Sequence, residues 1–386
     1  MDKKQLLALF ICSLAGWTIF QGTLALLPVL AVRLGANDAL AGNYLAIVFT
    51  ALTAGTLVAG WLSDRFQRRK TTLVIASLVN IPATWLIGQA TELWQLIILT
   101  AIVYFFIGIG FTMINILAGL FAGESERGRI FGMLAINTSL GALIGGAVSG
   151  QIADHLGFPA LFLFCSLCWL IQLLVALLLD DKTINETEKK SVSASARRYV
   201  LGGSFTLFLL ATFAAFSANF IAVLGRPLVM DNLHFNSSAI SGAVSIGGFV
   251  SLPFPFLLGW MSDRMSRYGL IAICFLINAI GLIGLAESTT LWHFWASSIL
   301  LSGVGLSFGV GSALVTDLVT SENLSKALSW YGFATSMGGI LGFLLAGYAL
   351  QDFGARVALW GGAFITLIAI VLVIRAQQMR FAFSNG

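Results

Sequence analysis

The sequence predicts an all-α integral membrane protein with twelve transmembrane helices. Three observations support this fold class: an apolar composition, long apolar runs along the whole chain, and basic residues gathered on one side of the predicted membrane. Charged residues make up 10% of the 386 residues and hydrophobic residues 58%, with a mean hydropathy of +0.93. Because soluble domains carry about 25% charged residues, this composition indicates a chain surrounded by lipid.

The apolar runs have the length of membrane spans, since a helix needs about 20 residues to cross the hydrocarbon layer. They lack the two-residue alternation of a transmembrane β-barrel. The first run follows MDKK and is too long for the apolar core of a signal peptide, so we keep it as a span. In chain order the predicted spans are 5–32, 40–62, 71–90, 94–122, 128–153, 157–179, 200–230, 237–261, 269–287, 291–318, 325–350 and 354–375.

The basic residues predict the orientation. With the N-terminus in the cytoplasm, all of the 21 Lys and Arg residues except Arg33, Arg226 and Arg356 fall in inner segments. The positive-inside rule then places both termini in the cytoplasm and supports an even number of spans. The net charge of +4 therefore reflects inner loops that face membrane lipids, and nucleic acid is not an expected partner.

One long polar connection divides the spans into two groups of six. The segment 180–199 is rich in charged and small residues and is expected to be a flexible cytoplasmic linker. The predicted domains are thus an N-terminal six-helix bundle of residues 1–179 and a C-terminal six-helix bundle of residues 200–386.

The two predicted bundles repeat each other. The turn GWLSDRFQRRK at 60–70 returns as GWMSDRMSRYG at 259–269, and Pro28 returns as Pro227. A duplicated six-helix unit is the plan of many secondary transporters. Four glycines of the fifth span, Gly141, Gly145, Gly150 and Gly157, correspond at a nearly equal offset to Gly338, Gly342, Gly347 and Gly354.

The turn GWLSDRFQRRK resembles the signature between spans 2 and 3 of the major facilitator superfamily, G-x-L-[AS]-D-R-x-G-R-[KR], although Gln67 stands where a glycine is usual. The resemblance extends along the whole chain and is nearest to the bacterial drug and solute efflux branch. It implies two pseudo-symmetric bundles, alternating access, and a cavity between the halves lined by spans 1, 4, 7 and 10. We expect a monomer in the inner membrane of a bacterium.

The repeated turn is expected to be a conformational latch on the cytoplasmic side. Asp64 lies among cations, and it could pair with them or cap a helix of the other half, which is worth roughly 0.3–2 kcal/mol. The alternative is a solvated turn that only obeys the positive-inside rule. The candidate latch residues are Gly60, Asp64, Arg65, Arg68, Gly259, Asp263, Arg264 and Arg267.

Polar and aromatic residues inside the spans are candidates for a substrate cavity. Arg226 either reaches the outer headgroups or serves as a cavity cation for an anionic or carbonyl-bearing solute. The others could equally form hydrogen bonds to neighbouring helices. The candidates are Gln21, Tyr104, Phe111, Asn115, Asn137, Asn219, Arg226 and Tyr331.

The sequence does not identify the residue that would couple transport to an energy source. All 17 acidic residues fall in loops or at predicted span ends, so no carboxylate marks a proton site near the membrane centre. Tyr104 also occupies the place where the drug-efflux branch commonly has an arginine. Gly132, Gly141, Gly145 and Gly150 match part of that family's antiporter signature, which favours export.

We therefore expect a secondary transporter that exports a small amphipathic organic solute, with protons as the counter-ion. The alternative is an uncoupled facilitator or importer of an organic anion. An enzyme is not expected because the spans contain no H-E-x-x-H or G-x-S-x-G motif. No cofactor, metal or disulfide is expected either, because Cys12, Cys165, Cys168 and Cys274 lie inside predicted spans as packing residues.

Overall fold

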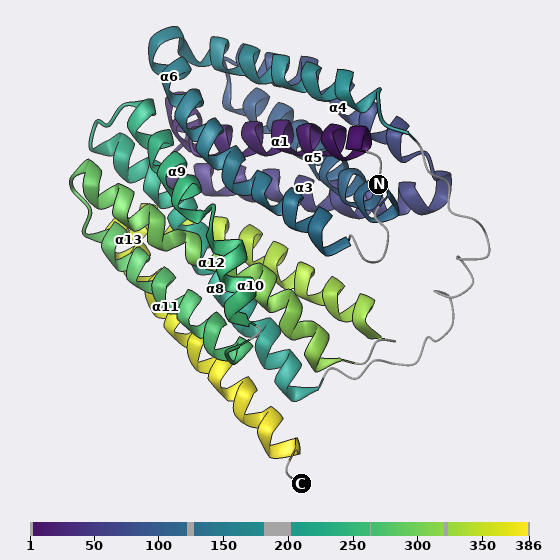
Figure 1. Ribbon diagram of the computed structural model, residues 1–386. Coiled ribbons are helices and arrows are strands. Elements are labelled where there is room, and N and C mark those ends of the chain that lie inside the picture. The colour runs from purple at the N-terminus through teal and green to yellow at the C-terminus, as the bar shows by residue number, and fades with distance from the viewer. Residues whose placement is uncertain (1–2, 122–126, 181–201, 263, 320–322, 385–386) are drawn as a thin grey trace. The chain divides into compact units, whose positions relative to one another are not determined.

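The computed structural model describes residues 3–121, 127–180, 202–262, 264–319 and 323–384, and its elements are all α-helices (Figure 1). In chain order they are α1 (Lys3–Leu24), α2 (Leu27–Arg33), α3 (Asp38–Phe66), α4 (Arg69–Ile87), α5 (Leu93–Phe121), α6 (Arg127–Ala176), α8 (Gly203–Asn232), α9 (Ser237–Ser251), α10 (Phe254–Ser262), α11 (Arg267–Ala286), α12 (Leu291–Leu318) and α13 (Leu324–Ser384).

These helices provide the predicted twelve spans once their breaks are considered. In the described ranges, 9 helices are long and apolar enough to cross a membrane, and the pair α9 and α10, bent by 44°, makes one more span. Two of the 9, α6 with 50 residues and α13 with 61, are each long enough for two crossings and are interrupted by a glycine. The prediction of a twelve-span all-α membrane protein is confirmed.

The two interrupting glycines adopt nearly the same backbone conformation. Gly157 has φ 84° and ψ 170°, and Gly354 has φ 78° and ψ 163°. Glycine adopts such positive φ values without the steric cost that a Cβ would bring. These two positions correspond in the predicted repeat, so the repeat extends from the sequence to the backbone geometry.

Two spans expected to be continuous are broken. The first span divides at residues 25–26 into α1 and α2, with Pro28 in the first turn of α2. The eighth divides at residues 252–253 into α9 and α10, where Pro253 and Pro255 stand close together. Proline removes a backbone N–H and clashes with the preceding turn. Pro227, the repeat partner of Pro28, lies inside the continuous helix α8.

The chain forms two compact units that do not coincide with the sequence halves. Unit 1 consists of Met1–Gln21, Ile47–Gly141 and Gln151–Tyr199, and unit 2 of Gly22–Ala46, Ala142–Gly150 and Val200–Gly386. Unit 2 thus includes segments of α1, α3 and α6 and the whole of α2. Apart from residue 180, the predicted linker 180–199 lies outside the described residues, so the boundary between the two predicted bundles stays a prediction.

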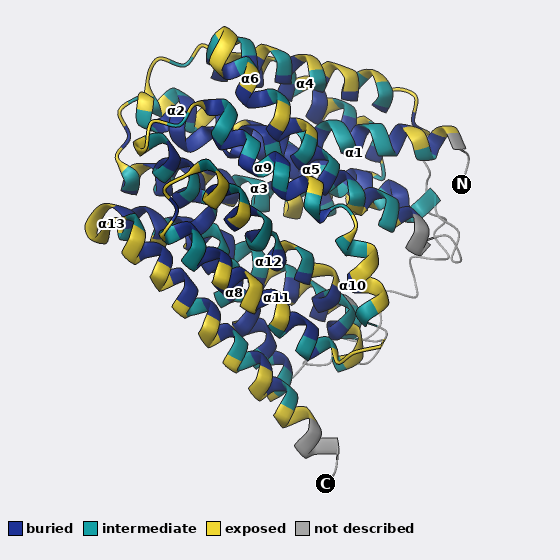
Figure 2. Ribbon diagram, turned by 60° about the vertical axis from the view of Figure 1, so that its left-hand side comes forward, coloured by how far each residue is buried: buried dark blue, intermediate teal, exposed yellow. Residues whose placement is uncertain are grey.

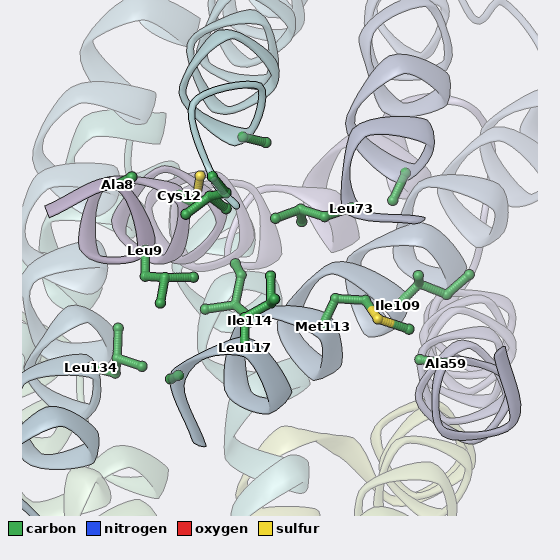
Figure 3. Packing of buried hydrophobic residues seen from close by; sticks show 14 of the residues in the cluster. Ala8, Leu9, Cys12, Ala59, Leu73, Ile109, Met113, Ile114, Leu117 and Leu134 are labelled. Carbon is green, nitrogen blue, oxygen red and sulfur yellow. The ribbon is translucent and has the colours of Figure 1, made fainter. Parts of the chain in front are cut away.

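The core of unit 1 is a cluster of aliphatic side chains from several helices (Figure 3). Leu9 and Cys12 of α1 lie beside Ile114 and Leu117 of α5, and Leu73 of α4 approaches the same group. Leu9, Leu73 and Leu117 are fully buried. Burying such a side chain stabilises a fold in water by about 1.5–3 kcal/mol, whereas close packing carries more of the stabilisation among helices in lipid.

Small residues allow the helices of each unit to approach closely. In unit 2, a Cβ at Gly338 of α13 would lie 2.8 Å from the Phe213 carbonyl oxygen of α8. In unit 1, a Cβ at the corresponding Gly141 of α6 would lie 2.6 Å from the carbonyl carbon of Trp17 in α1. Figure 2 shows α13 buried along one face and exposed along the other, as expected for a helix that faces lipid.

The far end of α11 is linked to α13 by polar contacts. Glu287 accepts hydrogen bonds from Trp360 Nε1 at 3.0 Å and from Arg356 Nε at 2.8 Å. The hydrogen bonds from Trp360 and Arg356 hold the pKa of the Glu287 carboxyl below its ordinary value. These groups are largely exposed, so the pair orients the helix end and contributes little stability.

The turn between α3 and α4 places Gln67 in the left-handed region, with φ 54°. This is the position where the family signature has glycine. A residue with a Cβ is disfavoured in this region by roughly 1–2 kcal/mol. The missing glycine of the signature therefore coincides with a strained backbone position.

We expect Gln67→Gly to raise the free energy of unfolding by up to about 1 kcal/mol, because relief of the strain exceeds the added freedom of the unfolded chain. The melting temperature of the purified protein measures this change. Ser266→Gly is the matched control, since Ser266 holds the same place in the second copy with φ −57°. The control should bring no gain, and equal shifts in the two variants would refute the strain at Gln67.

Candidate functional site

The first copy of the repeated turn contains one buried and several exposed charges. Arg69 is 2% exposed and donates from Nε to Ser63 Oγ at 2.9 Å. Asp64, Arg65 and Arg68 are exposed, and Asp64 forms no ion pair with another described residue. A Cβ at Gly60 would meet no atom within 4 Å. The predicted latch residues of this turn are therefore accessible in this conformation.

The arginines of the second copy of the repeated turn contact other residues of unit 2. Arg267 pairs with Asp317 of α12 at 2.7 Å and donates to the Ala313 carbonyl at 2.6 Å. The Arg264 guanidinium lies 3.9 Å from the centre of the Trp260 ring. A Cβ at Gly259 would meet no atom within 4 Å. Asp263, the predicted partner of Asp64 in the repeat, lies outside the described residues.

Two of the predicted cavity residues belong to an aromatic cluster in unit 1. This aromatic cluster consists of Trp17 and Phe20 of α1, Phe49 of α3, and Tyr104 and Phe111 of α5. Trp17 stacks on Phe111 with ring centres 4.6 Å apart, and Tyr104 lies 5.3 Å from Phe20. Trp17 and Phe111 are half-buried, as is the adjacent Gln21, so part of the cluster is accessible.

The other predicted polar residues differ in their surroundings. Asn137 is fully buried and donates to the Phe10 carbonyl at 3.1 Å, which is the helix-to-helix role left open by the sequence. Tyr331 is 2% exposed and stacks on Phe208 and Phe308 in unit 2. Asn115 is exposed and Asn219 half-buried. Of this group, Asn115 and Asn219 remain accessible.

Arg226 lies inside unit 2 with a neutral partner. Its NH1 group donates to Ser298 Oγ of α12 at 3.0 Å, and that hydroxyl donates in turn to the Phe294 carbonyl. No ion pair joins Arg226 to an acidic residue within the described ranges. The buried Arg226 Nε and Trp295 Nε1 atoms have no hydrogen-bond partner there. The Arg226 guanidinium thus lies against one serine of α12, and its Nε–H group has no partner among the described residues.

A close helix crossing joins α6 to α9 within unit 2, and we call it the α6–α9 seam. A Cβ at Gly146 would lie 2.6 Å from the Ser241 oxygen and the Ser245 nitrogen of the α9 backbone. A Cβ at Gly150 would clash with Ser241 Oγ. Ser245 Oγ donates to the Leu143 carbonyl at 2.8 Å, which adds a hydrogen bond to the crossing.

A second crossing, the α3–α13 seam, also lies within unit 2. A Cβ at Gly42 would lie 2.6 Å from the Phe343 carbonyl oxygen and 2.7 Å from Gly347 Cα. The seam is extended by a hydrogen bond of 3.3 Å from Asn43 Nδ2 to the Tyr348 hydroxyl. Asp64 lies 22 residues beyond Gly42 in the same helix, α3.

The two seams are copies of one contact. In the predicted repeat Gly150 corresponds to Gly347, and Ser241 corresponds to Gly42. Each seam therefore joins a helix of one sequence half to a helix of the other half through the same pair of positions. The repeated glycines are evident in the sequence but their partners are not, because helix faces that meet across the repeat cannot be read from spacing alone.

No cluster of potential metal ligands occurs in the described residues. Cys12, Cys165 and Cys274 are buried and Cys168 is half-buried, and none of them forms a disulfide.

Comparison with known proteins identifies a family. The model of the Major Facilitator Superfamily matches residues 6–224 and 207–378. The chain is 24% identical to the "Multidrug resistance protein MdtG" of Proteus mirabilis (strain HI4320) over 393 residues, covering 96% of both chains. The protein of the same name from Salmonella paratyphi A is 24% identical over 361 residues, covering 89% of this chain and 88% of that protein.

Solved structures with the same fold include a mutant of the nucleoside transporter NupG, with a TM-score of 0.80, 14% identity, and coverage of 96% of this chain and 99% of that one. A D-xylose–proton symporter has a TM-score of 0.74 at 16% identity, with 96% of each chain covered. At these identities the likeness concerns the fold.

Proposed function

Since this chain belongs to the Major Facilitator Superfamily and is a multi-pass membrane transporter, we propose that it exports small amphipathic organic solutes by alternating access. The proposal includes protons as the counter-ion, a monomer, and both termini on the cytoplasmic side of a bacterial inner membrane. The aromatic cluster of unit 1 is the observation that carries it.

The aromatic cluster suits a planar or apolar solute. Trp17 and Phe111 present stacked, half-buried rings, and stacking on such rings is worth about 0.5–1.5 kcal/mol per pair beyond area burial. The neighbouring Gln21 amide offers an NH2 group as donor and a carbonyl oxygen as acceptor, without a charge. A site of this kind selects for apolar area and tolerates variation in polar groups, which is the behaviour of a multidrug exporter.

Two further observations favour export. Both curated relatives are named multidrug resistance proteins, and Gly132, Gly141, Gly145 and Gly150 match part of the antiporter signature. Alternating access requires two states within a few kcal/mol of each other. We propose that the described conformation, with both seams closed and Gly60 and Gly259 uncovered, is one of these states.

We expect Asp64→Asn to reduce transport by about tenfold while changing solute affinity less than twofold. The proposed latch acts in the other state, where a carboxylate at a helix end is worth roughly 1–2 kcal/mol. Solute flux in reconstituted vesicles and equilibrium binding to the purified protein measure the two quantities. Lys70→Gln, in the same turn but outside the candidate latch residues, serves as a control for loss of charge in the turn. A parallel loss of flux and affinity in Asp64→Asn would remove the latch.

The proposed coupling has its own test. Vesicles with an imposed pH gradient should drive solute uphill, and solute entry should move protons in the opposite direction. A flux that follows only the solute gradient and ignores pH would eliminate proton antiport and leave an uncoupled facilitator.

A second candidate is transport of an organic anion. It is supported by Arg226, whose described partner is a neutral serine. A cation inside a membrane span without a counter-ion is costly, and an anionic solute would remove part of that cost when it binds. Competition between neutral and anionic solutes for binding separates the two candidates.

A further inference from the structure

Unit 1 contains a line of polar side chains between α4 and the second part of α6. Gln172 Nε2 donates to Ser77 Oγ at 3.1 Å, and Ser166 Oγ donates to the Ile81 carbonyl at 2.7 Å. Further along, a Cβ at Gly88 would lie 3.0 Å from Phe162 Cβ. Because rising numbers in α4 meet falling numbers in α6, the two helices are antiparallel in a fixed register.

This register places Asn80 opposite Trp169. Asn80 lies one turn beyond Ser77, and Trp169 lies one turn before Gln172, so both fall between the two observed hydrogen bonds. Thr84 follows Asn80 by four residues on the same face of α4. All are almost completely buried: Asn80 and Thr84 are 1% exposed, and Trp169 and Gln172 are 2% exposed.

The polar atoms at this level have no partner among the described residues. They are Asn80 Nδ2 and Oδ1, Thr84 Oγ1, Trp169 Nε1 and Gln172 Oε1. Buried polar groups in native proteins are almost always hydrogen-bonded to protein or to ordered water. Five such atoms on two adjoining helices therefore indicate a bound molecule.

We propose that this polar line is a hydration site that holds one or two ordered water molecules. The set combines N–H donors on Asn80 and Trp169 with acceptors on Asn80 and Gln172. A metal cation would face the two N–H groups, and an anion would face the amide oxygens. Water both donates and accepts, and a buried water makes about three hydrogen bonds, so one or two waters provide partners for these atoms.

The site adjoins the aromatic cluster. A Cβ at Gly16 would lie 2.9 Å from Phe111 Cε1 and 3.4 Å from Gln172 Oε1, so Gln172 and the ring of Phe111 meet at the same point of α1. The proposed water therefore lies beside the aromatic cluster, where it would hold the Gln172 amide in place.

The C-terminal half carries a related asparagine. Asn278 of α11 lies 198 positions after Asn80 of α4, between the offset of 199 in the repeated turn and the offset of 197 for the glycines of the fifth and eleventh spans. Asn278 is fully buried, and both of its amide atoms have no partner among the described residues. A buried asparagine without a described partner thus occurs in both halves, which supports a hydration site as part of the repeated unit.

The direct test is magnetisation transfer between water and the Trp169 indole N–H in protein labelled with ¹⁵N-tryptophan. Trp169→Phe assigns the signal. We expect a cross-peak to water with the sign of a long-lived complex, and we expect Asn80→Leu to abolish it. Absence of the cross-peak in the unmodified protein would overturn the proposal, because it would mean that no long-lived water lies at the Trp169 indole N–H.

The melting temperature provides a second test, because the direction of its change distinguishes a hydrated site from an empty one. Asn80→Leu and Thr84→Val should lower the melting temperature, because each removes an anchor of the water and leaves its other partners unsatisfied. Thr366→Val is the matched control, since Thr366 is equally buried but its hydroxyl donates to the Gly362 carbonyl of its own helix. A higher melting temperature in both Asn80→Leu and Thr84→Val would overturn the proposal. An apolar side chain stabilises the protein when it replaces a buried polar group that has no partner, not even water.

Discussion

Gly146→Val is expected to reduce solute transport by ten- to a hundredfold while the protein stays folded and binds its solute. A side chain at this position meets the backbone of Ser241 and Ser245, where a Cβ would already lie at 2.6 Å. Backbone atoms of two packed helices cannot rotate away as a side chain can. Overpacking of this kind costs about 1–3 kcal/mol, so the state with the α6–α9 seam closed loses most of its population.

Flux into reconstituted vesicles measures this effect, and equilibrium binding shows that the site survives. Gly132→Val is the matched control on the same helix, since a Cβ at Gly132 meets no atom within 4 Å. Gly347→Val in the α3–α13 seam should reproduce the loss, because Gly347 corresponds in the repeat to Gly150 of the α6–α9 seam and a Cβ there would lie 2.9 Å from the Asp38 carbonyl oxygen. Full flux in Gly146→Val, or the same loss in Gly132→Val, would show that the seam does not control transport.

Arg226→Leu is expected to reduce the apparent affinity for an anionic solute by about ten- to a hundredfold and to leave neutral solutes unaffected. The range follows from the roughly 1.5–3 kcal/mol of a hydrogen bond to a charged group. Removing a cation that has only a neutral partner should also leave the melting temperature unchanged or higher. Binding of paired anionic and neutral solutes of similar size measures the difference.

Two further variants separate the roles of the guanidinium. Arg226→Lys keeps the positive charge but removes the Nε–H group that lacks a partner among the described residues, so it should recover part of the affinity. Ser298→Ala removes the observed hydrogen-bond partner and should change affinity much less than Arg226→Leu. Equal affinity for all solutes in Arg226→Leu would assign Arg226 to helix packing alone.

The span pattern was predictable because it depends on local properties of the sequence. Apolar runs and the distribution of arginine and lysine indicated the twelve crossings, and Gly157 and Gly354 already stood at the predicted span boundaries. The breaks in the first and eighth spans were also encoded, by Pro28, Pro253 and Pro255. They were missed because a proline inside a membrane helix is compatible with either a bend or a continuous helix, as Pro227 shows.

The candidate sites were only partly predictable because they depend on which helix faces meet. Tyr104 and Phe111 were identified from their spacing, but Trp17 and Phe49 join them only through helix packing. Gln172 and Asn80 lie 92 positions apart in the sequence, and nothing in either segment indicates the other. Tyr331 shows the converse, since a polar group near the middle of a span packs between two phenylalanines.

The central claim is that the seams open and close in each transport cycle. Asn43 and Tyr348 face each other across the α3–α13 seam at 3.3 Å. Both can be replaced by cysteine in a background without the four native cysteines, and a short reducible bis-thiol reagent can then link them. We predict that the cross-linked protein still binds solute but transports none, and that reduction restores the flux. Full transport by protein that is quantitatively cross-linked at this seam would contradict the account.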